Sequence, residues 1–278
     1  MAYDDPFPSS PLIEKTRPLT ERHISQIPKT SYYWRKVLPF LTPKYTVVAA
    51  DMRGTGDSTH PDGGYDMATI ADDLAELMTH LGHEKFHFCG EDWGAAAGYQ
   101  IAARYPKRVL SLVFQEMLLP GFGLEQWAEF NPDRPETHLW HVSFYSVRDV
   151  PELLITGRER EYLTWFLKNE AYTPTGIDDD AIDEYVRQYS QPGGLRGMFN
   201  IYRATEPNVK QNREASKKKL EMPVLAIGSE AFIGKAVGEQ MEKLARHSEY
   251  QELKFGHQLA EECPEQLANV YLNFLNAL

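Results

Sequence analysis

The segment CGEDWGAAAG, residues 89–98, places an aspartate between two glycines in the pattern Gly90-x-Asp92-x-Gly94. The apolar run Phe86–Cys89 precedes this turn, and a run of small residues follows it. The pattern predicts a buried strand, a strained turn and then a helix that packs closely on a sheet. The carboxylate of Asp92 is therefore expected between a strand and a helix N-terminus, where the helix dipole favours negative charge.

Strand-like and helix-like patterns alternate in the first and last parts of the chain. Further apolar runs predict strands over residues 45–50, 109–114, 223–227 and 250–255. Amphipathic or small-residue patterns predict helices over residues 67–81, 95–105, 237–245 and 264–275. Nearly unbroken apolar strands are typical of sheets that are covered on both faces. The alternation therefore predicts an α/β fold with a mostly parallel sheet.

The alternation stops between about residues 119 and 220, where aromatic residues and helical patterns predominate. Helices are predicted there over residues 159–169, 178–189 and 194–202. We therefore predict a first core part over residues 1–119, an inserted helical cap over residues 120–220 and a second core part over residues 221–278. Residues 1–22 show no convincing strand pattern, so residues 1–30 are expected to be irregular and the N-terminal strands to be missing or replaced.

Composition excludes several classes of function. The 29 Lys and Arg residues against 40 Asp and Glu give a net charge of −11, which argues against nucleic acids and anionic membranes as partners. No apolar run is long enough to cross a bilayer, and the N-terminus lacks the apolar region of a secretory signal. Only two cysteines, Cys89 and Cys263, occur, which suits a reducing, cytoplasmic compartment. Since no CxxC or HExxH spacing occurs, neither a metal nor a cofactor is expected.

Asp92 can act as a nucleophile without a base to activate it, because a carboxylate is already ionised at neutral pH. It would attack an sp³ carbon and form an ester, which a histidine then hydrolyses by activating water. His257 follows the last predicted strand and precedes the last predicted helix, where the base is expected in this chain order. The alternatives are that Asp92 only caps the following helix and that His257 is an ordinary loop histidine.

Seven segments carry a family pattern in the expected order: DMRGTGDS (51–58), GEDWGA (90–95), FQEMLLPG (114–121), LWHVSFY (139–145), YRATEPNVKQN (202–212), MPVLAIGSE (222–230) and GHQLAEECPE (256–265). With them the chain resembles epoxide hydrolases of the α/β-hydrolase superfamily, which are close to haloalkane dehalogenases. The resemblance covers most of residues 30–278. It implies an α/β-hydrolase fold with a helical cap, and the opening of a small apolar epoxide to a diol through an alkyl ester on Asp92.

The resemblance also implies roles for further residues. Glu116, one strand after Asp92, matches the acid that orients the histidine in one branch of the family, and Glu230 is the alternative acid. His141 and Tyr202 match a histidine–tyrosine pair in the cap that donates to the epoxide oxygen. A phenol with an ordinary pKa near 10 stays protonated at neutral pH and can serve as such a donor.

The N-terminal part departs from the family pattern. Family members carry an HGxP loop whose backbone supplies half of the oxyanion hole, whereas an ungapped alignment places Ser25-Gln26-Ile27-Pro28 there. The backbone N–H of Trp93 remains as one oxyanion donor, and that of Ile27 is expected to replace the other. One such donor is typically worth roughly 10²–10³ in rate. Glu91 also stands where the family usually has a histidine.

Aromatic residues of the cap indicate an apolar substrate, with Trp93, Trp140 and Phe144 as expected contacts. Fluoroacetate dehalogenases resemble the chain too, but Val142 and Trp93 occupy the positions with which they hold a substrate carboxylate. A carboxylate substrate is therefore disfavoured. The open alternatives are a haloalkane dehalogenase, a ligand-binding pseudoenzyme, and a cofactor-free cyclase or isomerase in a biosynthetic pathway. A homodimer is compatible with the sequence.

Overall fold

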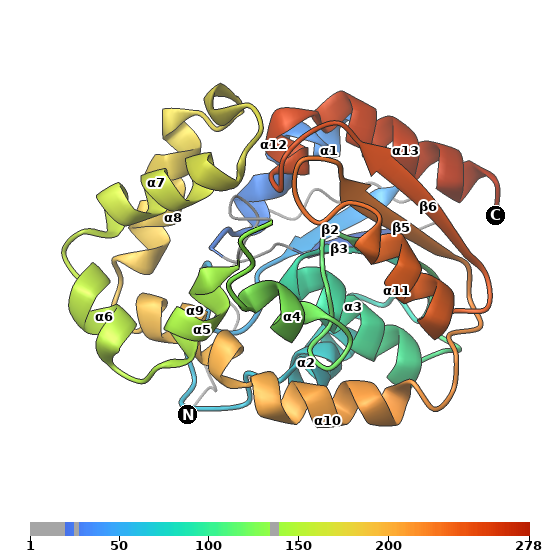
Figure 1. Cartoon of the computed structure of the whole chain (residues 1–278). Coiled ribbons are helices and arrows are strands. Elements are labelled where there is room, and N and C mark those ends of the chain that lie inside the picture. Colours follow the sequence, from blue (N-terminus) through green and yellow to red (C-terminus); the bar gives the residue numbers. More distant parts are fainter. Residues whose placement is uncertain (1–19, 25–27, 134–138) are drawn as a thin grey trace, which may run out of the picture.

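The computed structural model describes residues 20–24, 28–133 and 139–278 (Figure 1). Within them the chain forms one sheet of six parallel strands in the order β2-β1-β3-β4-β5-β6. The strands are β1 (Thr20–Ile24), β2 (Thr46–Ala50), β3 (Phe86–Glu91), β4 (Val109–Gln115), β5 (Val224–Ser229) and β6 (Ser248–Leu253). The parallel sheet confirms the fold class that the alternating pattern predicts.

Successive residues of the central strands contact opposite faces of the sheet. Phe88 and Leu112 belong to one hydrophobic cluster, whereas their neighbours Cys89 and Val113 belong to another. Helices α2 (Met67–His80), α3 (Trp93–Arg104) and α11 (Ala236–Leu244) contribute to the first cluster, and η1 (Ser31–Lys36), α1 (Leu38–Leu41), α12 (Leu259–Glu262) and α13 (Pro264–Asn276) contribute to the second. Both faces are buried, which explains the apolar sequences of the central strands.

The chain between β4 and β5 is helical. Its elements are α4 (Leu124–Ala128), α5 (Trp140–Ser146), α6 (Val150–Ile155), α7 (Glu159–Glu170), η3 (Pro174–Gly176), α8 (Asp179–Tyr189), α9 (Gly194–Arg203) and α10 (Thr205–Ala215). In Figure 1, α5 to α9 form a layer to the left of the sheet, and α10 runs below α2 and α3. This arrangement supports the predicted cap, whose boundaries at residues 120 and 220 remain a prediction.

Helix α10 connects the end of this helical stretch to the core through side-chain hydrogen bonds. The side-chain oxygen of Asn208 accepts from the backbone N–H of Met67 at 2.8 Å, at the start of α2. Asn212 accepts from the side chain of Gln100 in α3 at 2.7 Å and donates to the carbonyl of Pro120 at 3.0 Å. Because both asparagines are fully buried, these hydrogen bonds fix where the chain leaves and re-enters the core.

The prediction that residues 1–30 are irregular is wrong for residues 20–24. These residues form β1, which pairs with β2 on one side and β3 on the other, in the interior of the sheet. Their sequence, TERHI, has no apolar run, so the pattern gave no strand signal. Pairing on both sides satisfies the backbone whatever the side-chain propensity. The expectation for residues 1–19 lies outside the described residues.

Candidate active site

Asp92 lies on a strained turn between β3 and α3. Its φ of 53° is unusual for a residue with a side chain. A Cβ on Gly90 would come closer than 3.0 Å to the backbone of Gly94, so the turn requires a residue without a side chain there. The side chain of Asp92 makes no hydrogen bond that caps α3, and it lines a cavity instead. The helix-capping alternative for Asp92 is therefore not what the structure shows.

Glu116 occupies the equivalent place after the neighbouring strand β4, with a φ of 47°. Its Oε2 lies 3.1 Å from Nδ1 of His257, and its Oε1 accepts from the backbone N–H of Ser229 at 2.5 Å. Burial, with the charges of Glu91 and Asp92, raises the pKa of Glu116 well above its ordinary value. The alternative acid, Glu230, is exposed. The geometry therefore favours Glu116 as the partner of the histidine.

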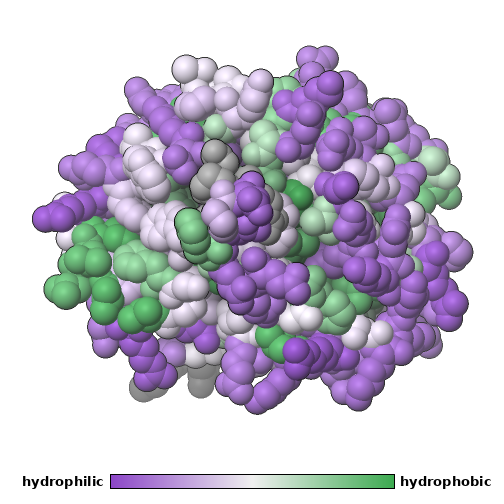
Figure 2. Space-filling view, viewed as in Figure 1, coloured by the Kyte–Doolittle hydropathy of each residue, from purple (hydrophilic) through white to green (hydrophobic). Residues whose placement is uncertain are grey.

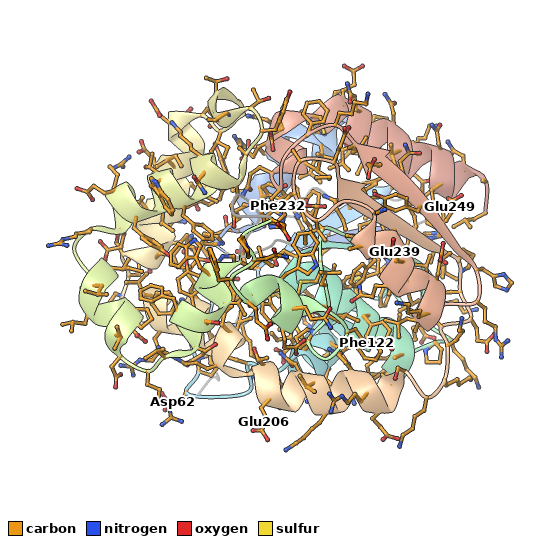
Figure 3. The ribbon with its side chains drawn as sticks, in the orientation of Figure 1. Asp62, Phe122, Glu206, Phe232, Glu239 and Glu249 are labelled. Carbon is orange, nitrogen blue, oxygen red and sulfur yellow. The ribbon has the colours of Figure 1, made fainter. Side chains whose placement is uncertain are left out.

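His257 lies in the loop after β6 and faces the same cavity. Its ring packs on Phe232, with 4.4 Å between the ring centres, and Figure 3 shows Phe232 between the helical layer and the ends of β5 and β6. Burial lowers the pKa of His257 well below its ordinary value, and the neighbouring Lys29 and His141 act in the same direction. The imidazole is therefore neutral at neutral pH and able to accept a proton.

His141 from α5 and Tyr202 from α9 line the cavity on the side of the helical layer. Their ring centres lie 5.7 Å apart, and Tyr202 also packs edge-on against Trp93 at 5.1 Å. Burial and the negative charge of Asp92 raise the pKa of Tyr202 well above its ordinary value. Tyr202 therefore keeps its proton and can donate it to an oxygen atom that develops charge near Asp92.

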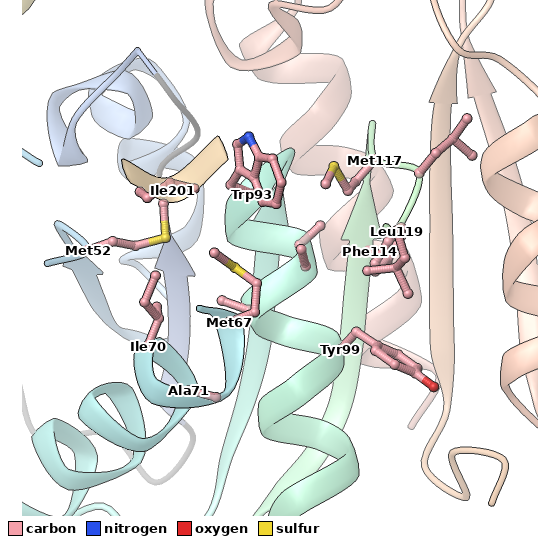
Figure 4. Packing of buried hydrophobic residues seen from close by; sticks show 14 of the residues in the cluster. Met52, Met67, Ile70, Ala71, Trp93, Tyr99, Phe114, Met117, Leu119 and Ile201 are labelled. Carbon is pink, nitrogen blue, oxygen red and sulfur yellow. The ribbon is translucent and has the colours of Figure 1, made fainter. Parts of the chain in front are cut away.

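The cavity contains ≈ 390 Å³ of space between atoms, part of which opens to solvent. Its walls are mostly apolar, with Met117, Leu118, Leu124, Leu139, Val142, Phe166, Phe232 and Ile233 beside the polar groups. Figure 4 shows two of its lining residues, Trp93 at the first turn of α3 and Met117 beyond the end of β4. Within the described residues, no lysine or arginine lines it. The space suits a small, uncharged substrate.

Two of the expected substrate contacts do not reach the cavity. Trp140 and Phe144 belong to α5, yet only their neighbour His141 and the following Val142 line the space. The rings of Trp140 and Phe144 pack on each other with centres 5.7 Å apart, and Trp140 also contacts Trp165, which is 53% exposed. The α5 helix thus turns these aromatic rings away from the site. Ile27, the expected second oxyanion donor, lies outside the described residues.

Glu170, at the end of α7, is a lining residue that the sequence analysis missed. Its Oε1 lies 3.9 Å from Nδ1 of His141, and its Oε2 accepts from the side chain of Gln258 at 3.2 Å. Burial raises the pKa of Glu170 to about 8; the cation of Lys29 lowers it, and the charges of Asp92 and Glu91 raise it further. The one available signal was its position four residues after Phe166, on the face of α7 that also lines the cavity.

Lys29 is a buried cation beside the site, and it too was missed. It is 1% exposed, and its ammonium lies 4.5 Å from the centre of the Tyr33 ring. Its Nζ has no hydrogen-bond partner in the described part of the chain. Burial lowers the pKa of Lys29, whereas the charges of Glu91, Glu170 and Asp92 act in the opposite direction. Lys29 therefore offsets part of the negative charge that surrounds the cavity.

Glu91 lies behind the cavity rather than in its wall. Its carboxylate accepts from the hydroxyl of Tyr33 at 2.7 Å and from the side chain of Gln115. The Gln115 side chain in turn accepts from the hydroxyl of Tyr271 at 2.6 Å. This network holds the carboxylate of Glu91 outside the cavity wall. The glutamate that stands where the family usually has a histidine therefore does not add a further acid to the wall, which Asp92, Glu116 and Glu170 line.

Comparisons with known proteins show what this chain is similar to. A family model described as alpha/beta hydrolase fold matches residues 24–137. A soluble epoxide hydrolase from Corynebacterium sp. (strain C12) is 31% identical over 256 residues, which cover 90% of this chain and 88% of that protein. A fluoroacetate dehalogenase from Burkholderia sp. is 27% identical over 260 residues, which cover 90% and 84%. The crystal structure of Cfl2 from Burkholderia cenocepacia matches with a TM-score of 0.89 at 34% identity, covering 94% and 89% of the two chains.

Proposed function

Because this chain belongs to the α/β-hydrolase family, we propose that it hydrolyses a small apolar epoxide to a diol through an ester on Asp92. The observation that carries the proposal is the composition of one cavity. A carboxylate on a strained turn, a neutral histidine with its acid and a protonated phenol all line it. Similarity to a named soluble epoxide hydrolase over most of both chains supports the same reaction.

In the first step, an oxygen of Asp92 attacks an epoxide carbon and the C–O bond of the ring breaks. The electron pair of that bond moves to the ring oxygen, which takes a proton from the donor pair of Tyr202 and His141. The product is an alkyl ester on Asp92. This step needs no base, since the nucleophile is already a carboxylate.

In the second step, His257 takes a proton from water and the hydroxide attacks the ester carbonyl of Asp92. The imidazolium that forms is stabilised by Glu116, whose carboxyl oxygen lies 3.1 Å away. The backbone N–H of Trp93 is our proposed donor to the oxyanion, together with that of Ile27. As the acyl C–O bond breaks, His257 gives its proton to the departing diol oxygen. The carboxyl group of Asp92 then loses its proton, which replaces the one that the donor pair gave up, and Asp92 is a carboxylate again.

Dehalogenation of a haloalkane is the second candidate, because the indole of Trp93 lines the cavity and indole N–H groups can donate to a halide. A protonated phenol favours the epoxide, since an alkoxide needs a proton whereas a halide does not. Fluoroacetate fits less well. Three carboxyl groups, those of Asp92, Glu116 and Glu170, line the cavity, and no lysine or arginine does so within the described residues. The carboxylate of Asp92 would repel an anionic substrate, and no lysine or arginine in the described wall offsets that charge.

A single turnover in H₂¹⁸O with enzyme in excess over a small epoxide tests the proposal. The oxygen that enters the diol comes from Asp92, so the first diol should carry little label and the peptide with Asp92 should carry it. Label in the first diol would mean that water attacks the epoxide directly and that the proposal is wrong. Halide release from haloalkanes without epoxide turnover would support the dehalogenase. A ligand bound without any turnover would support a pseudoenzyme, or a cyclase or isomerase.

The proposal extends to compartment and assembly. Cys89 and Cys263 are buried free thiols, which supports a reducing cytoplasmic compartment. None of the helices in the described ranges is long and apolar enough to cross a membrane. Figure 2 shows a hydrophobic patch over α6, where Leu153 is 79% and Leu154 is 52% exposed. Such a patch supports a homodimer, which light scattering of the purified protein would test.

A further inference from the structure

We propose that Glu170 is a positioning residue that orients His141 and returns to it the proton that His141 gives to the epoxide oxygen. The inference rests on the proposed function and deepens it. Glu170 and His141 both line the cavity that contains Asp92, and their side chains are each 10% exposed. The geometry thus joins a second acid–histidine pair to the site, in addition to the pair of Glu116 and His257.

The positions of the atoms permit this transfer. Oε1 of Glu170 lies 3.9 Å from Nδ1 of His141, which leaves Nε2 of the same ring for the substrate. Because 3.9 Å exceeds hydrogen-bonding distance, a side-chain shift of about 1 Å or one bridging water completes the link. The other oxygen of Glu170 accepts from the side chain of Gln258 at 3.2 Å, which holds the carboxyl group in the cavity wall.

The proton balance closes over one turnover. When the ring C–O bond breaks, Nε2–H of His141 donates to the alkoxide, and the carboxyl proton of Glu170 moves to Nδ1. His141 is neutral before and after, while Glu170 becomes a carboxylate. Hydrolysis of the ester then releases one proton, because Asp92 is regenerated as a carboxylate. That proton enters at Nε2 of His141 while the proton on Nδ1 passes back to Glu170. The starting tautomer of His141 and the acid form of Glu170 are thereby restored without an additional reactant.

Charge around Glu170 favours its protonated form at neutral pH. Burial raises its pKa to about 8, and the acids Asp92 and Glu91 at the end of β3 contribute to the increase, against the cation of Lys29. The phenols that face it stay neutral, because their pKa values are raised by burial and in part by Glu170 itself: they are Tyr145, Tyr162 and Tyr202. A carboxylic acid is therefore present in the cavity at pH 7, ready to donate.

The backbone of Glu170 also contacts the base loop. Its carbonyl accepts from the backbone N–H of His257 at 2.9 Å. A Cβ on Gly256 would lie 2.5 Å from the same carbonyl, so only glycine permits this close approach. Glu170 could therefore influence activity merely by holding this loop, and the experiment has to separate that structural role from proton transfer.

The test is the pH profile of the ester-forming step, measured by rapid quench for the wild type and Glu170→Gln. In the wild type the rate should fall above about pH 8, as Glu170 loses its proton. Glu170→Gln keeps the size and the acceptor but has no proton to return. The rate below pH 8 should drop about 10-fold to 100-fold, and the decline above pH 8 should disappear. A retained decline near pH 8 would overturn the inference.

Glu262→Gln is the matched control. Glu262 accepts from the backbone N–H of Thr173 at 2.6 Å and of Gln258 at 3.2 Å. Like Glu170, it therefore contacts both the chain near the end of α7 and the loop after β6, but it does not line the cavity. The decline near pH 8 should remain in this variant even where it lowers stability. If Glu262→Gln removed the decline as well, the effect would be structural and the inference would be wrong.

Two further variants test the route through His141. Lys29→Met removes the cation that holds the pKa of Glu170 down, so the decline should move to higher pH. In a His141→Gln background, Glu170→Gln should cause less than a 2-fold further loss, because residues that act as one unit are not additive. Full additivity of the two substitutions, or an unmoved decline in Lys29→Met, would contradict the inference.

Infrared spectroscopy of the substrate-free protein separates this inference from the proposed function. Because burial also raises the pKa of Glu116, the readout is the component of the protonated-carboxyl band that titrates near pH 8. This component should be present in the wild type and missing from Glu170→Gln. The same component in both proteins would overturn the inference, whatever happens with epoxides. A wild type that converts no epoxide would overturn the proposed function, and with it the inference.

Discussion

Two residues in the site, Asp92 and Glu116, have positive φ values of 53° and 47°. Each follows the last residue of one of two adjacent strands, β3 and β4. A residue in this conformation costs on the order of 1–3 kcal/mol, which the surrounding structure has to offset. This conformation directs both carboxyl groups out of the sheet and toward the cavity. In the proposed ester hydrolysis, Asp92 carries the ester and Glu116 stabilises the imidazolium of His257.

His257→Gln should form the ester on Asp92 and then stop. The first step needs no base, whereas the second needs His257 to activate water, and loss of a general base typically lowers a rate by roughly 10²–10⁴. Mass spectrometry should show the peptide with Asp92 carrying one substrate. His247→Gln, at an exposed position, is the control and should turn over normally. Absence of a covalent adduct would argue against Asp92 as nucleophile.

Tyr202→Phe should slow ester formation more than ester hydrolysis, since its hydroxyl serves the epoxide oxygen only in the first step. We expect a loss of about 10² in the first step and less than 10-fold in the second. The indole of Trp93, whose ring centre lies 5.1 Å from that of Tyr202, offers a fluorescence signal for stopped-flow measurement of both steps. Equal slowing of the two steps would contradict this role.

Motifs in the sequence identify residues that must sit at fixed places in the chain. Asp92, Glu116 and His257 each follow a strand, so their order along the chain predicts that they meet at one edge of the parallel sheet. Glu170 and Lys29 carry no such signal. Their relevance comes from burial next to charges that are distant in the sequence, and only the packed structure shows that burial.

At the scale of elements, the end of α7 and the loop after β6 form the contact that joins the helical layer to His257, the proposed base. The backbone N–H of His257 donates to the carbonyl of Glu170, and the hydroxyl of Ser229 donates to the carbonyl of Gly256 at 2.6 Å. The loop is therefore held from β5 on one side and from α7 on the other. Movement of the helical layer would move the base with it.

Gly256→Ala should separate these two elements. The added methyl group would lie 2.5 Å from the carbonyl of Glu170 and closer still to the backbone of Tyr172, so the contact has to open. Overpacking of this kind typically costs about 1–3 kcal/mol in the free energy of unfolding. Ester hydrolysis should slow more than ester formation, because His257 serves only the second step.

Gly63→Ala is the control for that substitution, since its added methyl group meets nothing within 4 Å. Chemical denaturation of both variants and single-turnover kinetics would measure the two effects. If Gly256→Ala hydrolysed the ester at the wild-type rate, the contact would be dispensable for catalysis.

The strand and helix patterns predicted most of the core elements to within a few residues, because buried parallel strands and amphipathic helices have clear periodicity. Strand β1 was not predicted, because TERHI lacks an apolar run and its conformation depends on pairing with β2 and β3. The α5 helix shows a second limit of prediction from sequence patterns. Its aromatic residues are evident in the sequence, but which of them face the cavity depends on how the helix packs.

At the scale of the whole molecule, the chain encloses an acidic cavity in an acidic protein. The net charge is −11, and Glu91, Asp92, Glu116 and Glu170 lie within or directly behind the cavity wall. The fold tolerates them because hydrogen bonds, the Lys29 cation and protonation offset their charges. Stability should therefore depend on pH through the groups of the site as well as through the surface.

The contribution of Glu170 to that dependence has a definite sign. Its pKa is raised from an ordinary value of 4.5 to about 8 in the folded protein, so the folded state binds the proton more tightly than the unfolded state. The stabilisation that this proton gives is fully present below about pH 4.5 and is lost as the pH rises through about 8. Above that pH the folded protein carries a buried carboxylate, which burial disfavours.

The stability of Glu170→Gln relative to the wild type should therefore increase as the pH rises. The amide fills the same space without ever becoming charged, so the melting temperature of the variant minus that of the wild type should increase between pH 4.5 and 8 and level off above it. Calorimetry at pH 5, 6.5, 8 and 9 would measure this difference. Glu249→Gln, at an exposed position in β6 (Figure 3), removes one carboxylate from the surface and should give a flat difference over the same range. A flat difference for Glu170→Gln as well would mean that the carboxyl group is ionised in the folded protein at neutral pH, and that the acid facing His141 has no proton to give.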